Sequence, residues 1–184
     1  MIFVTVGTQL PFDRLVAAVD RWAAVNGRAD VFAQIGDTRW RPQVIRSVPF
    51  LTPGEFQKTF ANASVIVSHA GLGTIISALE VDKPVVVMPR RAALEEHRND
   101  HQLATARRFA GRQSVAVAFD EHEIAGQLDS LETLVAGERI GTGAAPELIT
   151  AIRHFIAGMP LQPADPAADQ GEPVNATRRP ASAR

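Results

Sequence analysis

The chain has 184 residues, 46% of them hydrophobic and 21% charged, which suits one soluble domain with a buried core. The formal net charge of −1 gives no indication of a nucleic-acid partner, and the absence of cysteine excludes disulfides and thiolate chemistry. The apolar runs are too short to cross a bilayer, and no charged segment precedes an apolar one at the N-terminus. We therefore expect a cytoplasmic protein.

The N-terminal part of the chain predicts a strand, a loop and a helix. Residues 2–6 form an apolar strand, and Gly7 and Thr8 follow it in a loop of small and polar residues. A helix is expected from Pro11 to about Asn26, because apolar residues recur there at helical spacing. The first strand of such folds is usually central, so Gly7 and Thr8 either form a plain turn or line a ligand crevice.

The next segment predicts two strands and a short helix. Residues 31–35 and 44–48 are rich in β-branched and apolar side chains, and the second run gives the weaker signal. The stretch 55–63 carries Phe56 and Phe60 four residues apart. This spacing indicates a short amphipathic helix with both rings in the core.

The centre of the chain, residues 65–80, combines a strand, a glycine-rich turn and a helix. A short β-branched run predicts a buried strand, and a helical pattern begins near Thr74, after Gly71 and Gly73. Glycines let the backbone approach a ligand closely, and the free N–H groups of a first helical turn attract anions. With the imidazole of His69 at the strand end, the pattern favours a phosphate site over a plain turn.

A second polar stretch follows the next strand. Residues 85–88 are four consecutive apolar residues, as in a strand that is buried on both faces of a parallel sheet. Residues 95–102 then carry charged or polar side chains and lead into a helix at 102–109. Because this loop leaves the sheet at the same edge as the glycine-rich turn, we favour a functional site over a solvated loop.

Two features of this region bear on its chemistry. Six arginines lie between residues 90 and 112: Arg90, Arg91, Arg98, Arg107, Arg108 and Arg112. Some of them could offset the charge of a diphosphate, whereas those on the helix more often face solvent. The spacing of Glu96, His97, Asp100 and His101 matches no common zinc motif, so we expect no metal site.

The C-terminal part predicts a domain end and a tail. Residues 115–118 form a last strand, and Asp120 is expected to cap a helix that runs to about Val135. A final helix from Pro146 to Gly158, with one apolar face, completes a domain at residues 1–159. Five of the 12 prolines and no aromatic residue fall after it, which predicts a disordered Pro/Ala-rich tail at residues 160–184.

The alternation of apolar strands with helices predicts an α/β fold with a doubly wound, Rossmann-like parallel sheet. In such a sheet the loops at the carboxyl ends of the strands meet at one edge. The loops that carry Gly7, His69 and Arg90 all follow strands, so we expect them to form one site.

Three motifs resemble the C-terminal, donor-binding half of a GT-B glycosyltransferase of family 28. They are Val4 to Thr8 with Phe12 and Asp13, Ser68 to Thr74 with Lys83 and Pro84, and Asn99 to Gln102. Together with their spacing they cover residues 2 to about 158. The similarity is greatest to stand-alone members: the soluble subunit of the two-chain UDP-N-acetylglucosamine transferase of dolichol-linked oligosaccharide synthesis, and the small subunits of bacterial two-chain exopolysaccharide transferases.

The resemblance implies a role for each matching position. The diphosphate would be held around His69 and Thr74, and the sugar hydroxyls by Asp100 and Gln102. The full set of candidate UDP-sugar-binding residues is Gly7, Thr8, His69, Gly71, Gly73, Thr74, Glu80, Arg90, Asn99, Asp100 and Gln102. No metal or other cofactor is implied besides the UDP-sugar itself.

One position departs from the family pattern. The family usually has a glutamate for the ribose hydroxyls at the position that Ser77 occupies here. Glu80 lies about one helical turn later, which displaces it by ~5 Å along the helix axis. Glu80 is therefore a candidate substitute for the missing ribose ligand.

The resemblance also implies a partner. In this family the acceptor site and the catalytic base belong to the N-terminal half, which stand-alone members obtain from a membrane-associated protein. We therefore expect an inverting hexosyltransferase in bacterial exopolysaccharide synthesis, using UDP-glucuronate or UDP-N-acetylglucosamine and a lipid-linked saccharide acceptor. Its partner subunit would recruit it to the inner face of the membrane. The alternatives are a non-catalytic nucleotide-sugar-binding regulatory module and a GT-B-type nucleotide-sugar epimerase.

Overall fold

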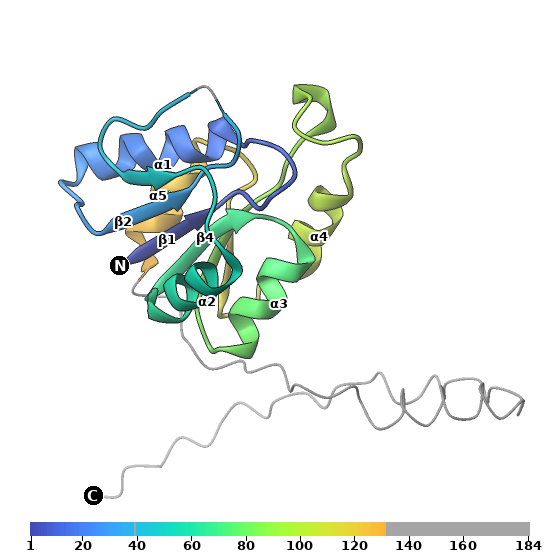
Figure 1. Ribbon diagram of the computed structural model, residues 1–184. Helices are drawn as coiled ribbons and strands as arrows, with labels where there is room; N and C mark the ends of the chain where they lie inside the picture. The colour runs from blue at the N-terminus through green and yellow to red at the C-terminus, as the bar shows by residue number, and fades with distance from the viewer. Residues whose placement is uncertain (39, 132–184) are drawn as a thin grey trace, which may run out of the picture. The chain divides into compact units, whose positions relative to one another are not determined.

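The computed structural model describes residues 1–38 and 40–131, which form a sheet flanked by helices (Figure 1). The strands are β1 (Ile2–Thr5), β2 (Val31–Gln34), β3 (Arg46–Val48), β4 (Val65–His69), β5 (Val85–Met88) and β6 (Val115–Val117). The helices are α1 (Asp13–Val25), α2 (Pro53–Asn62), α3 (Leu72–Glu80), α4 (His101–Phe109) and α5 (Glu123–Asp129), with a 3-10 turn η1 (Ala92–Leu94). The predicted final helix and tail lie outside the described residues.

The sheet has the order β3-β2-β1-β4-β5-β6, and all of its strand pairs are parallel. This is the doubly wound order, and the predicted fold class is confirmed. The strand order reverses between β1 and β4, where the chain crosses from one half of the sheet to the other. In open α/β sheets, ligands bind outside the carboxyl ends of the strands at this point.

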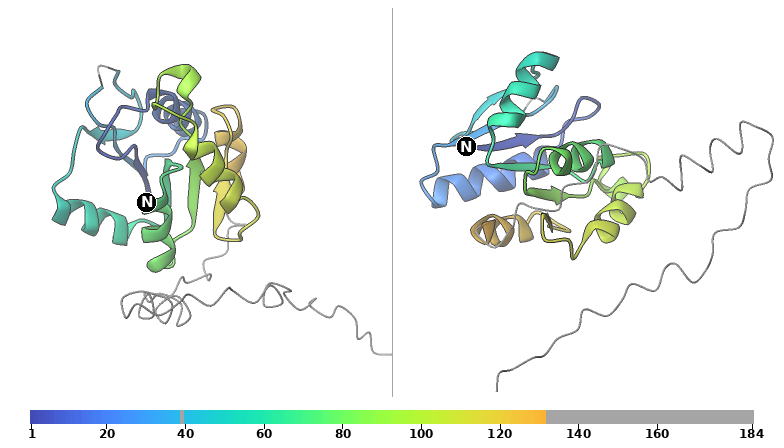
Figure 2. Two further views of the ribbon diagram at one scale, coloured as in Figure 1. Left: turned by 90° about the vertical axis from the view of Figure 1, so that its right-hand side faces the viewer. Right: turned by 90° about the horizontal axis from the view of Figure 1, so that it is seen from below.

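Alternate side chains of the strands build two cores, one on each face of the sheet. Val4 and its neighbours on one face pack with residues of α1 and α5, such as Leu15 and Ile124. Phe3 on the other face packs with residues of α2, α3 and α4, such as Phe60 and Leu79. Figure 2 shows α1 and α2 on opposite sides of the sheet. The strands therefore read as continuous apolar runs because both of their faces are covered.

Several element ends differ from their predicted positions for identifiable reasons. Helix α2 begins at Pro53, two residues early, because Thr52 and Glu55 form a capping box: the Glu55 N–H donates to Thr52 Oγ1 at 3.4 Å and the Thr52 N–H to Glu55 Oε2 at 2.9 Å. Helix α5 begins three residues after Asp120, whose side chain instead accepts from the His122 N–H in a turn. Helix α5 also ends at Asp129, before the predicted Val135.

The predicted strand and helix at the centre of the chain are both longer than expected. Strand β4 extends to His69, which pairs with Met88 of β5. Helix α3 begins at Leu72, so that Gly71 is its N-cap and Gly73 lies in its first turn. The turn between them is therefore very short, and His69 comes close to the helix N-terminus.

Candidate functional site

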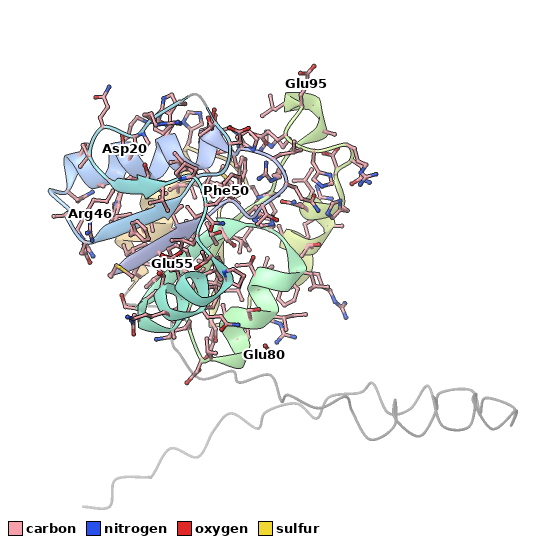
Figure 3. All side chains as sticks on the ribbon, viewed as in Figure 1. Asp20, Arg46, Phe50, Glu55, Glu80 and Glu95 are labelled. Carbon is pink, nitrogen blue, oxygen red and sulfur yellow. The ribbon has the colours of Figure 1, made fainter. Side chains whose placement is uncertain are left out.

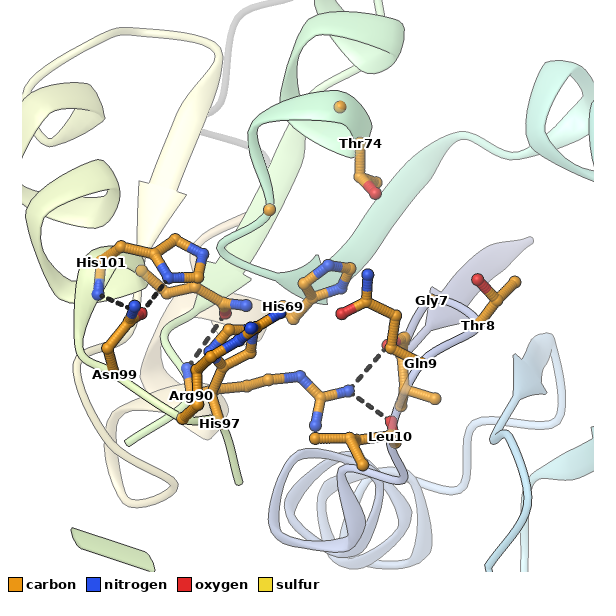
Figure 4. Close-up of a pocket in the computed structure, with 15 residues that line it drawn as sticks. Gly7, Thr8, Gln9, Leu10, His69, Thr74, Arg90, His97, Asn99 and His101 are labelled. Carbon is orange, nitrogen blue, oxygen red and sulfur yellow. Dashed lines mark hydrogen bonds between the residues drawn. The ribbon is translucent and has the colours of Figure 1, made fainter. Parts of the chain in front are cut away.

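A pocket of about 610 Å³ lies at the carboxyl edge of the sheet, between the loops that follow β1, β4 and β5 (Figure 4). Its lining residues are Val6, Gly7, Thr8, Gln9, Leu10, His69, Gly71, Gly73, Thr74, Arg90, His97, Arg98, Asn99, His101 and Gln102. Three segments distant in sequence therefore meet at the point where the strand order reverses.

The structure brings most of the predicted site residues together. Nine of them line this pocket: Gly7, Thr8, His69, Gly71, Gly73, Thr74, Arg90, Asn99 and Gln102. Glu80 and Asp100 do not. Val6 lies within the first motif and Gln9 and Leu10 follow it, but none of the three is among the predicted ligands. Their position directly after a central strand was the available clue.

The imidazole of His69 packs closely between two glycines, Gly7 and Gly71. A Cβ atom added to Gly71 would lie 2.3 Å from His69 Nε2, and one added to Gly7 would lie 3.0 Å from His69 Cε1. Gly7 also has a φ of +80°, in the left-handed region that favours glycine. Both glycines are thus required by the ring next to them, in addition to any ligand that approaches them.

His69 is held as a neutral side chain. Burial, together with the positive charge of Arg90, lowers the pKa of His69 from 6.5 to about 4. Its Nδ1 atom is buried and has no hydrogen-bond partner in the structure. A buried polar atom without a partner is uncommon, and at the wall of a pocket it indicates a group that a ligand can satisfy.

The N-terminus of α3 opens onto the same pocket. Gly71 provides no side-chain cap, and Gly73 and Thr74 of the first turn line the pocket. The first N–H groups of a helix have no partner within it, and the helix dipole makes this end electropositive. The anion site predicted from the glycine-rich turn is therefore geometrically available.

Arg90 lines the pocket, but its guanidinium is hydrogen-bonded to backbone carbonyls. Its guanidinium donates to the carbonyl oxygens of Val6 at 2.8 Å, Leu10 at 2.6 Å and Pro11 at 2.7 Å, and only 3% of the residue is exposed. Figure 4 shows Arg90 extending toward this loop. A direct ion pair with a ligand would require Arg90 to give up these bonds, so its predicted role beside the diphosphate is not supported by the geometry.

The opposite wall carries two histidines in contact. The rings of His97 and His101 are 4.5 Å apart and nearly perpendicular. Burial and the neighbouring positive charges of His101, Arg90 and Arg98 lower the pKa of His97. Its Nδ1 atom, like that of His69, is buried without a hydrogen-bond partner. His101 Nδ1 bonds to the Asn99 side chain, which fixes Asn99 at the pocket rim.

Two predicted sugar ligands take part in internal contacts. Asp100 Oδ1 accepts from the Ala92 N–H at 2.8 Å and stabilises η1, outside the pocket lining. Gln102 lines the pocket at the start of α4, and its Oε1 accepts from the Arg90 N–H at 3.2 Å. A sugar contact from Asp100 would therefore require this loop to rearrange, whereas Gln102 is already in place.

Glu80 lies away from the pocket. It is exposed at the C-terminal end of α3, whereas the pocket is at the other end, and Figure 3 shows it far from Glu95 of the loop after β5. Ser77 and Glu80 instead line a smaller hollow with Phe56 and Phe60 of α2. Helical geometry thus directs Glu80 to a different face, and its proposed contact with a ribose in the main pocket does not fit this structure.

The charged side chains that line the pocket are all basic. Two arginines, three histidines and no aspartate or glutamate are among the described residues that line it. The chain as a whole carries a formal net charge of −1, so this is a local excess of cationic and hydrogen-bond-donating groups. Within the described residues, no group of three or more histidine, aspartate or glutamate side chains is arranged to hold a metal ion. The pocket therefore suits an anionic ligand.

The fold and this pocket define a Rossmann-like α/β domain with a crevice lined by arginines and histidines at the switch point of its sheet. Residues 1–134 match the glycosyltransferase family 28 C-terminal domain, and the chain belongs to this family. Its fold is that of the donor-binding half of a GT-B glycosyltransferase, as the sequence motifs predicted.

The relatives agree with this assignment. The chain is 34% identical over 91 residues to the UDP-N-acetylglucosamine transferase subunit ALG13 of Eremothecium gossypii. The aligned residues make up 48% of this chain and 43% of that protein. The match thus spans less than half of the curated relative.

Among the solved structures that share the fold, two are informative. An NMR structure of ALG13 matches 76% of this chain and 89% of its own, with a TM-score of 0.54 and 18% identity. The UDP-GlcNAc 2-epimerase of Neisseria meningitidis, bound to UDP-GlcNAc, matches 85% of this chain and 44% of its own, with a TM-score of 0.55 and 12% identity. At these identities the likeness shows the fold and does not distinguish transferase from epimerase.

Proposed function

We propose that this chain is the donor-binding subunit of a UDP-sugar-dependent glycosyltransferase. The observation that carries the proposal is the pocket itself. It joins an uncapped helix N-terminus, two unsatisfied imidazole nitrogens and a lining without carboxylates, in a domain of glycosyltransferase family 28. Such a site matches the charge of a nucleoside diphosphate.

The donor half contributes electrostatic stabilisation and orientation. Negative charge grows on the UDP as it leaves the sugar, and the α3 amides and His69 are placed to donate hydrogen bonds to it. No metal ion is needed for this step. Asn99 and Gln102 lie on the other wall, where they orient the sugar for attack by an acceptor hydroxyl, with inversion at the anomeric carbon.

The donor sugar is UDP-N-acetylglucosamine or UDP-glucuronate. The ALG13 relative is named for UDP-N-acetylglucosamine transfer, which supports the first. Arg98 supports the second, because it lines the pocket and is exposed, so that its charge is available to a carboxylate. Calorimetry with both donors on the same preparation decides between them.

The acceptor side of the cleft comes from a second protein in this proposal. The matched family model is a C-terminal domain, and the ALG13 relative is named as a subunit. None of the helices described here has the length and apolar character needed to cross a membrane. The partner is a membrane-associated subunit that supplies the catalytic base, binds the lipid-linked saccharide and recruits this chain to the cytoplasmic face of the membrane for exopolysaccharide synthesis.

The first experiment tests donor binding. Calorimetry should detect UDP binding to the purified chain, and His69→Ala should weaken it by about 1–3 kcal/mol, because a buried donor to the diphosphate is lost. His122→Ala is the matched control, since His122 is exposed and lies outside this pocket. Absence of UDP binding at millimolar concentration would refute the proposed function. An unchanged affinity in His69→Ala, with a lowered melting temperature, would assign His69 to the core instead.

The second experiment tests the partner. The chain alone is expected to bind UDP-sugar but transfer no sugar, whereas the complex with its membrane-associated partner should transfer sugar to a lipid acceptor. Co-purification from a polysaccharide-producing cell followed by an assay on membranes measures this. Transfer by the purified chain alone would contradict the two-subunit arrangement. A complex that binds donor without ever transferring it would instead support a regulatory module.

A further inference from the structure

One buried cation connects the two walls of the pocket. Arg90 Nη1 donates to the carbonyls of Pro11 at 2.7 Å and Glu96 at 3.3 Å, while Nη2 donates to those of Val6 and Leu10. The carbonyls of Val6, Leu10 and Pro11 belong to the loop after β1, and that of Glu96 belongs to the loop after β5. A single planar group thus binds both loops at the wall of the pocket, which Arg90 itself lines.

A second contact joins the loop after β5 to the start of α1, which follows the first pocket loop. Arg14 at the start of α1 forms a two-bond ion pair with Glu96, with Nε–Oε1 and Nη2–Oε2 distances of 2.7 Å each. Both side chains are nearly buried, with 13% and 12% exposed. Glu96 Oε2 also accepts from the Arg91 N–H at 2.9 Å. Glu96 is therefore held by its side chain to α1 and by its carbonyl to Arg90.

Phe12 joins the two cations into one cluster. The guanidinium carbons of Arg90 and Arg14 lie 4.6 Å and 5.4 Å from the centre of its ring. Phe12 is the residue before α1, and it is fully buried. The cluster is thus anchored on the helix that follows the first pocket loop.

We propose that Arg90 and the Arg14–Glu96 ion pair are positioning residues that fix the loops at 7–11 and 91–100 relative to each other, and so set the spacing between the two walls of the pocket. The inference rests on the proposed function, in which one UDP-sugar contacts both walls. Gly7 and Thr8 lie on one side, and His97 and Asn99 lie on the other. A change in their separation would alter contacts with the ligand although Arg90 itself need not touch it.

The choice of arginine has a physical reason. A guanidinium presents donors in a fixed plane and can serve carbonyls in two directions, whereas a lysine ammonium is a compact charge on a flexible stem. Burial lowers the pKa of Arg90 to about 10, which still leaves it charged at neutral pH. The cost of burying this cation is offset by four carbonyl bonds, and its replacement would leave buried carbonyls without donors.

The first test separates positioning from charge. Arg90→Lys keeps the charge but not the planar donors, and Arg90→Met removes both. If Arg90 positions the loops, both variants should weaken UDP binding by about tenfold or more, the equivalent of about one net hydrogen bond. If Arg90 acts through its charge on the diphosphate, Arg90→Lys should bind UDP like the wild type, and the proposal fails. Calorimetry well below each melting temperature measures the affinity of the folded protein.

The second test uses the less buried Arg14–Glu96 pair. It remains informative even if the Arg90 variants fail to fold. Arg14→Met and Glu96→Gln should each weaken UDP binding, and the double variant should lose less affinity than the sum of the two single losses, because the two side chains share one contact. Each single variant also loses contacts of its own, since Arg14 bonds to Glu121 and the Pro89 carbonyl and Glu96 accepts from the Arg91 N–H. Arg28→Met is the control: Arg28 also forms a two-bond pair, with Asp30, and lies over Trp22, but this pair is more exposed, at 39% and 45%, and none of these residues lines the pocket. It should bind UDP like the wild type.

The outcomes distinguish this inference from the proposed function. If the wild-type chain binds no UDP, the proposed function fails first. If the wild type binds UDP, and the Arg14, Glu96 and Arg90 variants bind it equally well while melting at lower temperature, then the cluster is only structural and the positioning role is wrong. Additive losses in the Arg14 and Glu96 double variant would also overturn it.

Discussion

Replacing Gly71 with alanine is expected to weaken UDP binding by about 100-fold, equivalent to about 2.7 kcal/mol. The added methyl group would lie 2.3 Å from His69 Nε2, so the imidazole must move from its present position. It cannot move freely the other way, because the space beside Gly7 is also tight. The ligand would then lose the His69 contact and meet a displaced ring next to the N-terminus of α3. Calorimetric titration with UDP measures the effect.

A second glycine provides the control for this variant. Gly126 lies in α5, and a Cβ added to it meets no atom within 4 Å. Gly126→Ala should leave UDP affinity unchanged and stabilise the protein by about 0.4–1 kcal/mol, because alanine restricts the unfolded chain. Wild-type affinity in Gly71→Ala would show that the His69 ring is not held where the structure places it, or that it does not contribute to binding.

Protonation of His69 is expected to make the fold sensitive to acid. The pKa of His69 is about 4 in the folded protein and 6.5 without burial, as in the unfolded chain. Between these pH values His69 is protonated in the unfolded chain and neutral in the folded protein. Stability from this residue is complete above about pH 6.5, falls as the pH drops toward 4, and reaches a total loss of about 3 kcal/mol. Arg90, His97 and His101, which lower this pKa, all face the same pocket.

Urea unfolding at pH 7.5 and pH 4.5 measures this loss. The carboxylates of the protein also titrate at low pH, so the informative quantity is the difference between the wild type and His69→Gln, which cannot titrate at this position. The variant should lose less stability than the wild type between the two pH values. The control His122→Gln should lose as much as the wild type does. Equal losses in wild type and His69→Gln would show that His69 is not held neutral by burial.

Local sequence patterns were sufficient for the fold and for the location of the site. The apolar strands at 2–6, 65–67 and 85–88 were recognisable because burial on both faces removes the alternation of polar residues. Once those strands are parallel, their carboxyl ends must share one edge. The loops with Gly7, His69 and Asn99 then meet without further information, which is why most of the predicted site residues line one pocket.

The roles of particular side chains depended on contacts between distant segments. The position of Arg90 after a strand suggested a ligand contact, but its guanidinium is bound to carbonyls about 80 residues away in sequence. Glu80 was proposed from its spacing after Ser77, yet it lies at the far end of α3. Asp100 lies in a polar motif, but its carboxylate accepts from the Ala92 N–H.

The physical reason for this division is the range of the forces involved. Periodicity and glycine turns act within a few residues, so the sequence by itself determined the strands, the helices and the edge at which their loops emerge. A polar side chain in a loop takes whichever partner the folded chain brings near, since a buried donor or acceptor must be satisfied. Only the tertiary structure could therefore decide that Gly7 and Gly71 pack against the ring of His69. The same holds for Arg90, which joins the loop after β1 to the loop after β5.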